Sequence, residues 1–237
     1  MSKHTGLLLS SAIAGALVTL AAGPAQAQQS AFQYVEELVT NITPEANTWG
    51  SPCDIVWGDH TSGTGYSAKT NGACLFTQSL KKADPTITNS LLTFWFGSAS
   101  PDSTKYHDFI LAENKFENIT DFALAQPGDI LASKYLSNNI NTGYLMVLAY
   151  SEYVGESNGV SRYLIQVYDS TRAPHANTDT RWNGDAGAHD YGVGTGYLYV
   201  DTNPMTGEIL AHSWSTVLNG TYYTQQQRHL AVGRFVR

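Results

Sequence analysis

The chain of 237 residues is short of cysteine and of positive charge. Its two cysteines and its histidines do not follow the spacing of a zinc-binding motif. Lysine and arginine number 13 against 20 aspartate and glutamate residues, which gives a formal net charge of −7. Proteins that bind nucleic acid usually carry an excess of basic residues on one face, so this balance argues against a nucleic-acid partner.

Long apolar runs are missing after the first part of the chain. Residues 6–23 are nearly all apolar or small, follow Lys3, and precede the small residues Ala25 and Ala27, which is the pattern of a secretory signal peptide. No later run reaches the ~18 residues that a membrane-spanning helix needs. We therefore expect cleavage near Ala27, no membrane span, and a secreted or periplasmic mature protein. Loss of Lys3 takes its net charge from −7 to −8.

The mature chain is long enough for one domain and short for two. Residues 28–237 can bury one full core, and they contain no internal repeat or domain linker. Helical patterns occupy the first part, whereas strand patterns joined by short turns begin at Gln126. This order predicts a single α+β domain, with N-terminal helices packed on an antiparallel β-sheet. We expect it to be a monomer.

The expected helices follow from caps and apolar spacing. Ser30 can cap a helix that ends before Pro44, and Ser100 can cap one that starts at Pro101 and runs to about Glu113. Between them we expect one helix that starts just before Cys74, and the apolar residues 90–96 fit either a second short helix or a wall of a groove. The expected strands occupy residues 130–132, 144–150, 163–168, 195–201, 209–215 and 229–236.

Cys74 lies in the first turn of a predicted helix, where a thiol can become reactive. The free N–H groups and positive dipole end of a helix favour thiolate, and they lower the thiol pKa from ~8.5 by up to several units. Cys53 offers the opposite interpretation, because two cysteines in an exported protein usually form a disulfide. Such a bridge would add ~3 kcal/mol of stability and would leave Cys74 unable to attack a substrate. The sequence leaves both interpretations open.

Three features in this order resemble the NlpC-like cell-wall cysteine peptidases, which have a papain-like fold. They are a cysteine at the start of a helix, the Pro127-Gly128-Asp129 turn before a strand, and the strand at residues 141–147. The similarity runs from about residue 49 to residue 214. It implies a papain-like domain that needs no cofactor, with Cys74 as nucleophile and Asp169 as the residue that orients the base. Tyr144 stands where the family has its histidine.

Tyr144 is a poor replacement for that histidine, because a group with a pKa of ~10 cannot take the thiol proton near neutral pH. Another imidazole would have to act as the base. His175 lies six residues beyond Asp169 in a polar loop and is the first candidate. His212 sits within an expected strand, and His107 falls on an expected helix, where we expect a structural role.

Two further groups of residues are weaker candidates for binding. Asp179, Asp185 and Asp190 crowd a loop rich in glycine, but their spacing fits no EF-hand, so we expect a solvated loop and no metal site. A high content of aromatic residues also makes a groove for peptide or sugar conceivable, and its candidate walls are Phe94, Trp95, Trp182 and Trp214.

The sequence therefore gives two hypotheses from different classes. In the first, the protein is a hydrolase that cleaves an amide in peptidoglycan stem peptides or a similar protein substrate, with Cys74 attacking, Asp169 orienting and His175 as base. In the second, it is a silent relative with Cys53 and Cys74 bridged and Tyr144 at the base position, and its groove binds a wall fragment or a protein. An exported effector or toxin of the same fold is a more distant possibility.

Overall fold

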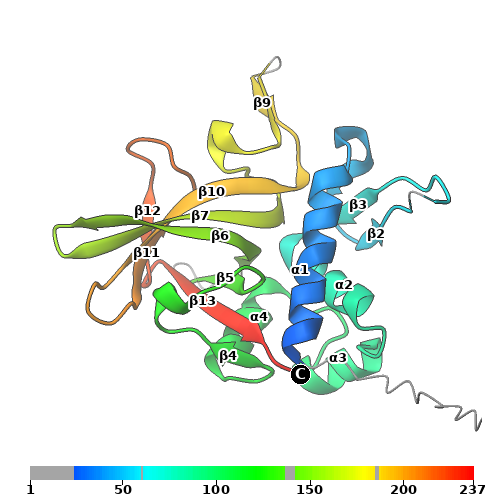
Figure 1. The fold of residues 1–237 in the computed structure, drawn as a ribbon, viewed down its shortest axis with the longest axis horizontal. Coiled ribbons are helices and arrows are strands. Elements are labelled where there is room, and N and C mark those ends of the chain that lie inside the picture. The colour runs from blue at the N-terminus through cyan, green and yellow to red at the C-terminus, as the bar shows by residue number, and fades with distance from the viewer. Residues whose placement is uncertain (1–23, 60, 137–141, 185–186) are drawn as a thin grey trace, which may run out of the picture.

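The structure is a computed structural model that describes residues 24–59, 61–136, 142–184 and 187–237 (Figure 1). Most of the predicted signal segment, His60 and Asp185 lie outside these ranges, and export of the protein stays a prediction. None of the helices in the described ranges is both long and apolar enough to cross a membrane. The helices are α1 (Pro24–Asn41), α2 (Gly72–Ala83), α3 (Asn89–Phe96) and α4 (Ser103–Leu111).

An eight-stranded antiparallel sheet forms the centre of the molecule, in the order β12-β11-β10-β7-β6-β5-β13-β4. Its strands are β4 (Phe116–Asn118), β5 (Ile130–Tyr135), β6 (Gly143–Ser157), β7 (Val160–Thr171), β10 (Gly192–Thr202), β11 (Ile209–Ser213), β12 (Tyr222–Thr224) and β13 (Arg228–Phe235). The predicted α+β class and antiparallel sheet are confirmed, and the papain-like fold remains a prediction. The smaller sheets contain β1 (Asn47–Trp49), β3 (Ser67–Thr70) and β2 (Asp54–Val56), and the pair β8 (Trp182–Asn183) and β9 (Ala188–His189).

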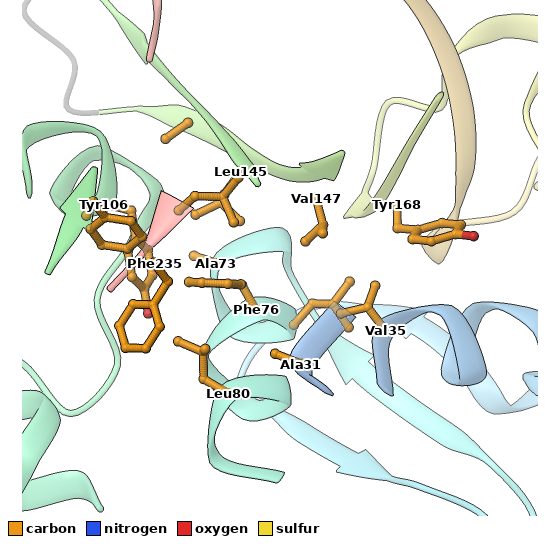
Figure 2. Packing of buried hydrophobic residues seen from close by; sticks show 14 of the residues in the cluster. Ala31, Val35, Ala73, Phe76, Leu80, Tyr106, Leu145, Val147, Tyr168 and Phe235 are labelled. Carbon is orange, nitrogen blue, oxygen red and sulfur yellow. The ribbon is translucent and has the colours of Figure 1, made fainter. Parts of the chain in front are cut away.

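Side chains of the central strands alternate between two faces of the large sheet. On one face, Leu145 and Val147 pack with Phe76 of α2 in a single apolar cluster (Figure 2). We call this the helix face. On the other, Met146 and Val167 belong to a second cluster, and we call this the far face. Burial of both faces is the main source of stability for such a domain.

The sheet curls around its far face. Gln225, just after β12, accepts a hydrogen bond from the Leu230 N–H at 2.7 Å and donates one to the Leu230 carbonyl at 3.2 Å. Leu230 belongs to β13, which five strands separate from β12 in the sheet order. A flat sheet could not bring these two strands together, so the far face is enclosed by the sheet itself.

Two helices start at residues that differ from those we expected. α1 begins at Pro24 rather than after Ser30, so its first turn overlaps the end of the predicted signal segment. Alanine and glutamine favour helix and proline is well suited to the first turn, which explains the earlier start. α4 begins after Asp102, whose carboxylate accepts from the Lys105 N–H at 2.8 Å, rather than after Ser100.

The helix predicted just before Cys74 is confirmed as α2, and residues 90–96 lie in the helix α3. Asn71 caps α2, because its side-chain oxygen accepts from the Cys74 N–H at 3.0 Å. Thr88 caps α3 in the same way, and Gly97 ends it in the left-handed conformation that glycine adopts without cost.

The segment before α2 contains β1 and is fixed to the large sheet. Asn47 donates to the Val193 carbonyl at 2.7 Å and accepts from the Val193 N–H at 2.8 Å. Gly192 makes this approach possible, since a Cβ atom there would lie 2.2 Å from the Asn47 side-chain oxygen. The result is that Trp49 pairs with Thr70, directly before α2.

Candidate functional site

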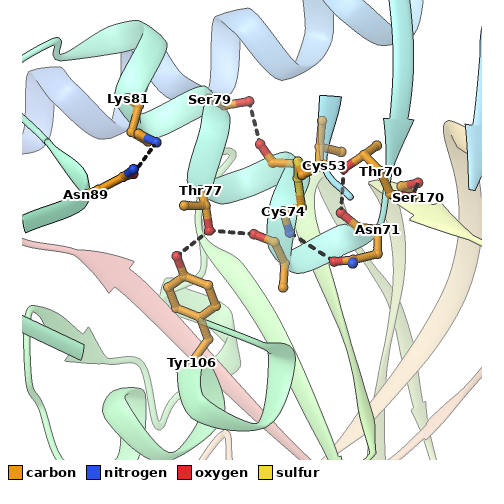
Figure 3. The surroundings of a disulfide bond; sticks show 12 residues. Cys53, Thr70, Asn71, Cys74, Thr77, Ser79, Lys81, Asn89, Tyr106 and Ser170 are labelled. Carbon is orange, nitrogen blue, oxygen red and sulfur yellow. Dashed lines mark hydrogen bonds between the residues drawn. A yellow bond between two sulfur atoms is a disulfide. The ribbon is translucent and has the colours of Figure 1, made fainter. Parts of the chain in front are cut away.

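Cys53 and Cys74 form a disulfide, which joins the loop before β2 to the first turn of α2 (Figure 3). Their Cα atoms lie 6.2 Å apart, and Cys74 is buried. The part of the chain that the structure describes contains no free cysteine. Of the two interpretations of Cys74, the structure thus agrees with the disulfide. In this state Cys74 has no thiol that could act as a nucleophile.

Asp169 lies on the far face of the sheet, away from α2. It pairs with Met146 across β6 and β7, and side chains of directly paired residues share a face. Its neighbour Ser170 points to the helix face, where its hydroxyl donates to the Thr70 carbonyl at 2.9 Å (Figure 3). Neighbouring residues of a strand point to opposite faces, so the residue that faces the α2 region is Ser170 rather than Asp169.

Asp169 and His175 meet in a buried cluster of charged groups. His175 Nε2 lies 3.2 Å from Asp169 Oδ2, and its Nδ1 lies 2.7 Å from the Trp214 carbonyl oxygen. Arg181 Nη2 is 2.8 Å from Asp169 and 2.6 Å from Asp179. Burial raises the pKa of Asp169, but the charges of Arg181 and His175 outweigh burial, so its pKa lies below the usual value.

This cluster corrects two expectations from the sequence. Asp179 is buried beside Arg181, although we expected a solvated loop, because the loop turns inward to pair these two side chains. Asp169 and His175 do come together, as expected, but the structure does not join them to Cys74. Both ring nitrogens of His175 already have partners, so neither is free to take a proton from a thiol.

Tyr144 stands at the beginning of β6, half-buried and packed between aromatic rings. The centre of its ring lies 4.5 Å from that of Trp214 and 5.7 Å from that of Tyr135. Trp214 in turn stacks on the His175 ring at 4.3 Å. Tyr144 thus connects the end of the far face with the surface beside α2.

A cleft of about 380 Å³ opens between the first turns of α2 and α4 and the beginning of β6. We call it the α2 cleft. Its floor depends on Gly72, because a Cβ atom at that position would lie 2.0 Å from the Leu145 carbonyl oxygen. The residues that line the cleft are Trp49, Asn71, Gly72, Ala73, residues 100–104, residues 142–145 and Ser170.

The lining of the α2 cleft suits binding better than acid–base chemistry. It includes residues with hydroxyl and amide side chains, the aromatic residues Trp49 and Tyr144, and one charged group, Asp102. Cys74, Asp169 and His175 are not among the lining residues. Oxygen Oδ1 of Asp102 is engaged by the Lys105 N–H and the Thr104 hydroxyl at 2.7 Å. A nucleophile with an adjacent base, the arrangement that amide hydrolysis by a cysteine enzyme needs, is not among these lining residues.

Three of the other histidines are buried or half-buried within the fold. His107 Nε2 lies 2.8 Å from His229 Nδ1, between α4 and β13, so the structural role expected for His107 agrees with its position. His212 lies in β11, where burial and the charge of Arg228 lower its pKa to about 4. The described residues contain no group of three histidine, cysteine or acidic side chains that could hold a metal ion.

The sequence did not identify the cleft residues Trp49, Asn71 and Gly72. The signal that could have found them is the Asn71-Gly72 pair, a helix cap followed by a residue that permits close approach to a strand. The four aromatic residues proposed as groove walls are absent from the lining of the α2 cleft. Phe94 is 84% exposed on α3, and Trp214 stacks on His175.

Comparison with known proteins finds a distant relationship. No protein-family model matches the chain, and no solved structure matches it. The chain is similar to an uncharacterized protein of Acanthamoeba polyphaga mimivirus, with 27% identity over 193 residues. The alignment covers 76% of this chain and 83% of that protein, so the similarity extends over most of both chains rather than over one motif.

Proposed function

We propose that the protein is a silent, disulfide-bridged relative of the NlpC-like peptidases that binds a cell-wall fragment in the α2 cleft. In this proposal the surface beside the bridged Cys74 is a binding site. The protein is exported, and the oxidising compartment keeps the Cys53–Cys74 bridge closed.

The observation that carries the proposal is the separation of the three expected catalytic residues. Cys74 is bonded to Cys53, whereas Asp169 and His175 are paired with each other and with Arg181 on the far face. A thiol needs an imidazole within hydrogen-bond distance to become an effective nucleophile, and general acid–base assistance contributes about 10² to 10⁴ in rate. Reduction of the bridge would therefore restore a thiol but no base.

The shape and chemistry of the α2 cleft support binding. The small residues Gly72 and Ala73 line it, and Trp49, whose side chain is 40% exposed, supplies an aromatic ring. Concave sites that combine aromatic walls with a few polar groups are the usual form of small-ligand sites. A net acidic protein whose cleft is lined by one carboxylate and no cation is suited to a neutral or cationic ligand rather than a polyanion.

The proposal is tested by incubating the purified protein with insoluble peptidoglycan and measuring both binding and hydrolysis. We expect cosedimentation of the protein with the wall, and no release of soluble fragments with or without a thiol reductant. Ser100→Trp would fill the cleft and reduce cosedimentation about ten-fold, a loss of ~1.4 kcal/mol. Ser90→Trp is the matched control, because Ser90 is exposed on α3 and does not line the cleft.

Two results would overturn the proposal. One is release of soluble wall fragments that disappears in a Cys74→Ala variant, which would make the protein a hydrolase. The other is cosedimentation that is equal for the Ser100→Trp and Ser90→Trp variants, or absent from the unmodified protein.

A further inference from the structure

A second hollow of about 410 Å³ lies beside the α2 cleft. We call it the outer hollow. It is lined by Pro44, by β1, and by residues that follow β7 and precede β10, namely Arg172, Asp190 and Tyr191. Trp49 lines both the α2 cleft and the outer hollow. One side chain therefore stands between two adjacent depressions of the surface.

The backbone at Trp49 is held in this position by strand pairing. It is the last residue of β1 and pairs with Thr70, and the following Gly50 N–H donates to the Thr70 carbonyl at 2.9 Å. Two hydrogen bonds of Asn47 fix the other end of β1 to β10. The Arg172 guanidinium lies 5.0 Å from the centre of a Trp49 ring, and the side chain remains 40% exposed. A ring fixed before the ligand arrives costs little entropy on binding.

The groups around Trp49 match one class of ligand. Tyr191 in the outer hollow adds a second ring and is 53% exposed. The two linings also include residues with amide, hydroxyl and carboxylate side chains, and the charges of Arg172 and Asp190 have opposite signs. Flat rings together with hydrogen-bonding groups suit sugar units, which present an apolar C–H face and a rim of hydroxyl groups.

An extended peptide fits this surface less well. Peptides that add to a sheet need a free strand edge, and the Asn47 side chain already occupies the backbone N–H and carbonyl of Val193 at the start of β10. Peptides that insert side chains need apolar pockets, and both hollows are lined largely by polar and aromatic groups.

Resting on the proposed function, we infer that the ligand is a neutral glycan strand that lies across Trp49 and occupies both hollows. The strand must therefore be longer than one hollow can hold. Its affinity depends on chain length, and Trp49 is the residue that joins the two parts of the site.

The test is calorimetric titration with chitin oligosaccharides of two and of six sugar units. We expect the hexamer to bind at least about ten-fold more tightly than the dimer, because only the hexamer reaches both hollows. Trp49→Ala should lower hexamer affinity about ten-fold, whereas Trp49→Tyr, which keeps a flat ring, should stay within about three-fold of the unmodified protein. Phe94→Ala is the control, because Phe94 is an exposed aromatic residue outside both hollows.

The outcomes separate this inference from the proposed function. Equal affinity for dimer and hexamer, or equal affinity of the Trp49→Ala and Phe94→Ala proteins, would overturn the inference. If a soluble stem peptide binds and the oligosaccharides do not, the glycan inference fails and the proposed function stands. If the protein binds neither these probes nor insoluble peptidoglycan, both fail. Circular dichroism of each variant establishes that it is folded, and Trp49→Tyr keeps the test open should Trp49→Ala unfold.

Discussion

At the scale of single residues, a group of side chains that resembles a catalytic site stabilises the fold instead. The group consists of Asp169, His175 and Arg181. The three side chains are almost completely excluded from solvent and pair with one another and with Asp179. Removing one partner of such a buried pair typically costs about 3–5 kcal/mol, because the remaining charge is left without compensation. The cluster therefore ties the loop after β7 to the sheet.

His212 gives a prediction for the pH dependence of stability. Burial, with the charge of Arg228, lowers its pKa from 6.5 to about 4 in the folded protein. Between pH 6.5 and 4, His212 binds a proton in the unfolded chain but not in the folded protein. Its contribution to the free energy of unfolding is therefore fully present above pH 6.5 and is lost as the pH falls toward 4. The expected loss from this one group is about 3 kcal/mol.

Urea unfolding at pH 7 and at pH 4.5 measures this effect. The His212→Leu variant should lose about 2–3 kcal/mol less between the two pH values than the unmodified protein does. The pKa values of His107 and His229 are also lowered by burial, and that contribution is common to both proteins. Parallel pH curves for the two proteins would contradict the assignment to His212.

At the scale of elements, the contact between α2 and β6 determines the shape of the candidate site. Gly72 lets the first turn of the helix lie directly on the Leu145 carbonyl, and Asn71 caps the same turn. The spacing of apolar residues predicted both elements correctly. It could not predict the contact, because helix periodicity does not state which strand a helix approaches or how closely.

The contact gives a second prediction. Gly72→Ala places a Cβ atom 2.0 Å from the Leu145 carbonyl oxygen, so α2 must move away from β6. We expect a loss of about 1–3 kcal/mol in the free energy of unfolding, measured with urea, and weaker wall binding. Gly65→Ala is the matched control, since a Cβ atom there meets no other atom within 4 Å. Equal stability of the two variants would show that the helix does not approach as described.

The sequence predicted most elements of the molecule, and it failed where the answer depends on which way a side chain points. The six expected strands and four expected helices are present, two of the helices with shifted starts, but Asp169 is on the far face and Ser170 on the helix face. A shift of one residue along a strand exchanges the two faces, and one sequence without its partner strands does not fix that register. The sequence left the state of Cys74 open because it does not show how close the loop with Cys53 comes to α2.

At the scale of the whole molecule, the disulfide joins the loop before β2 to α2 beside the curled sheet. It closes a loop over a sequence separation of 21 residues. By the loop-entropy model it contributes about 3 kcal/mol to stability. The helix start on which a hydrolase would carry its nucleophile is thereby fixed in place and made chemically inert.

Peptide mapping of the native, non-reduced protein tests this account most directly. The folded protein is treated with an alkylating reagent, digested without reductant and analysed by mass spectrometry. The account predicts a cross-linked peptide containing Cys53 and Cys74, with no alkylated cysteine. Alkylated Cys74 in the folded protein, with no Cys53–Cys74 peptide, would contradict it.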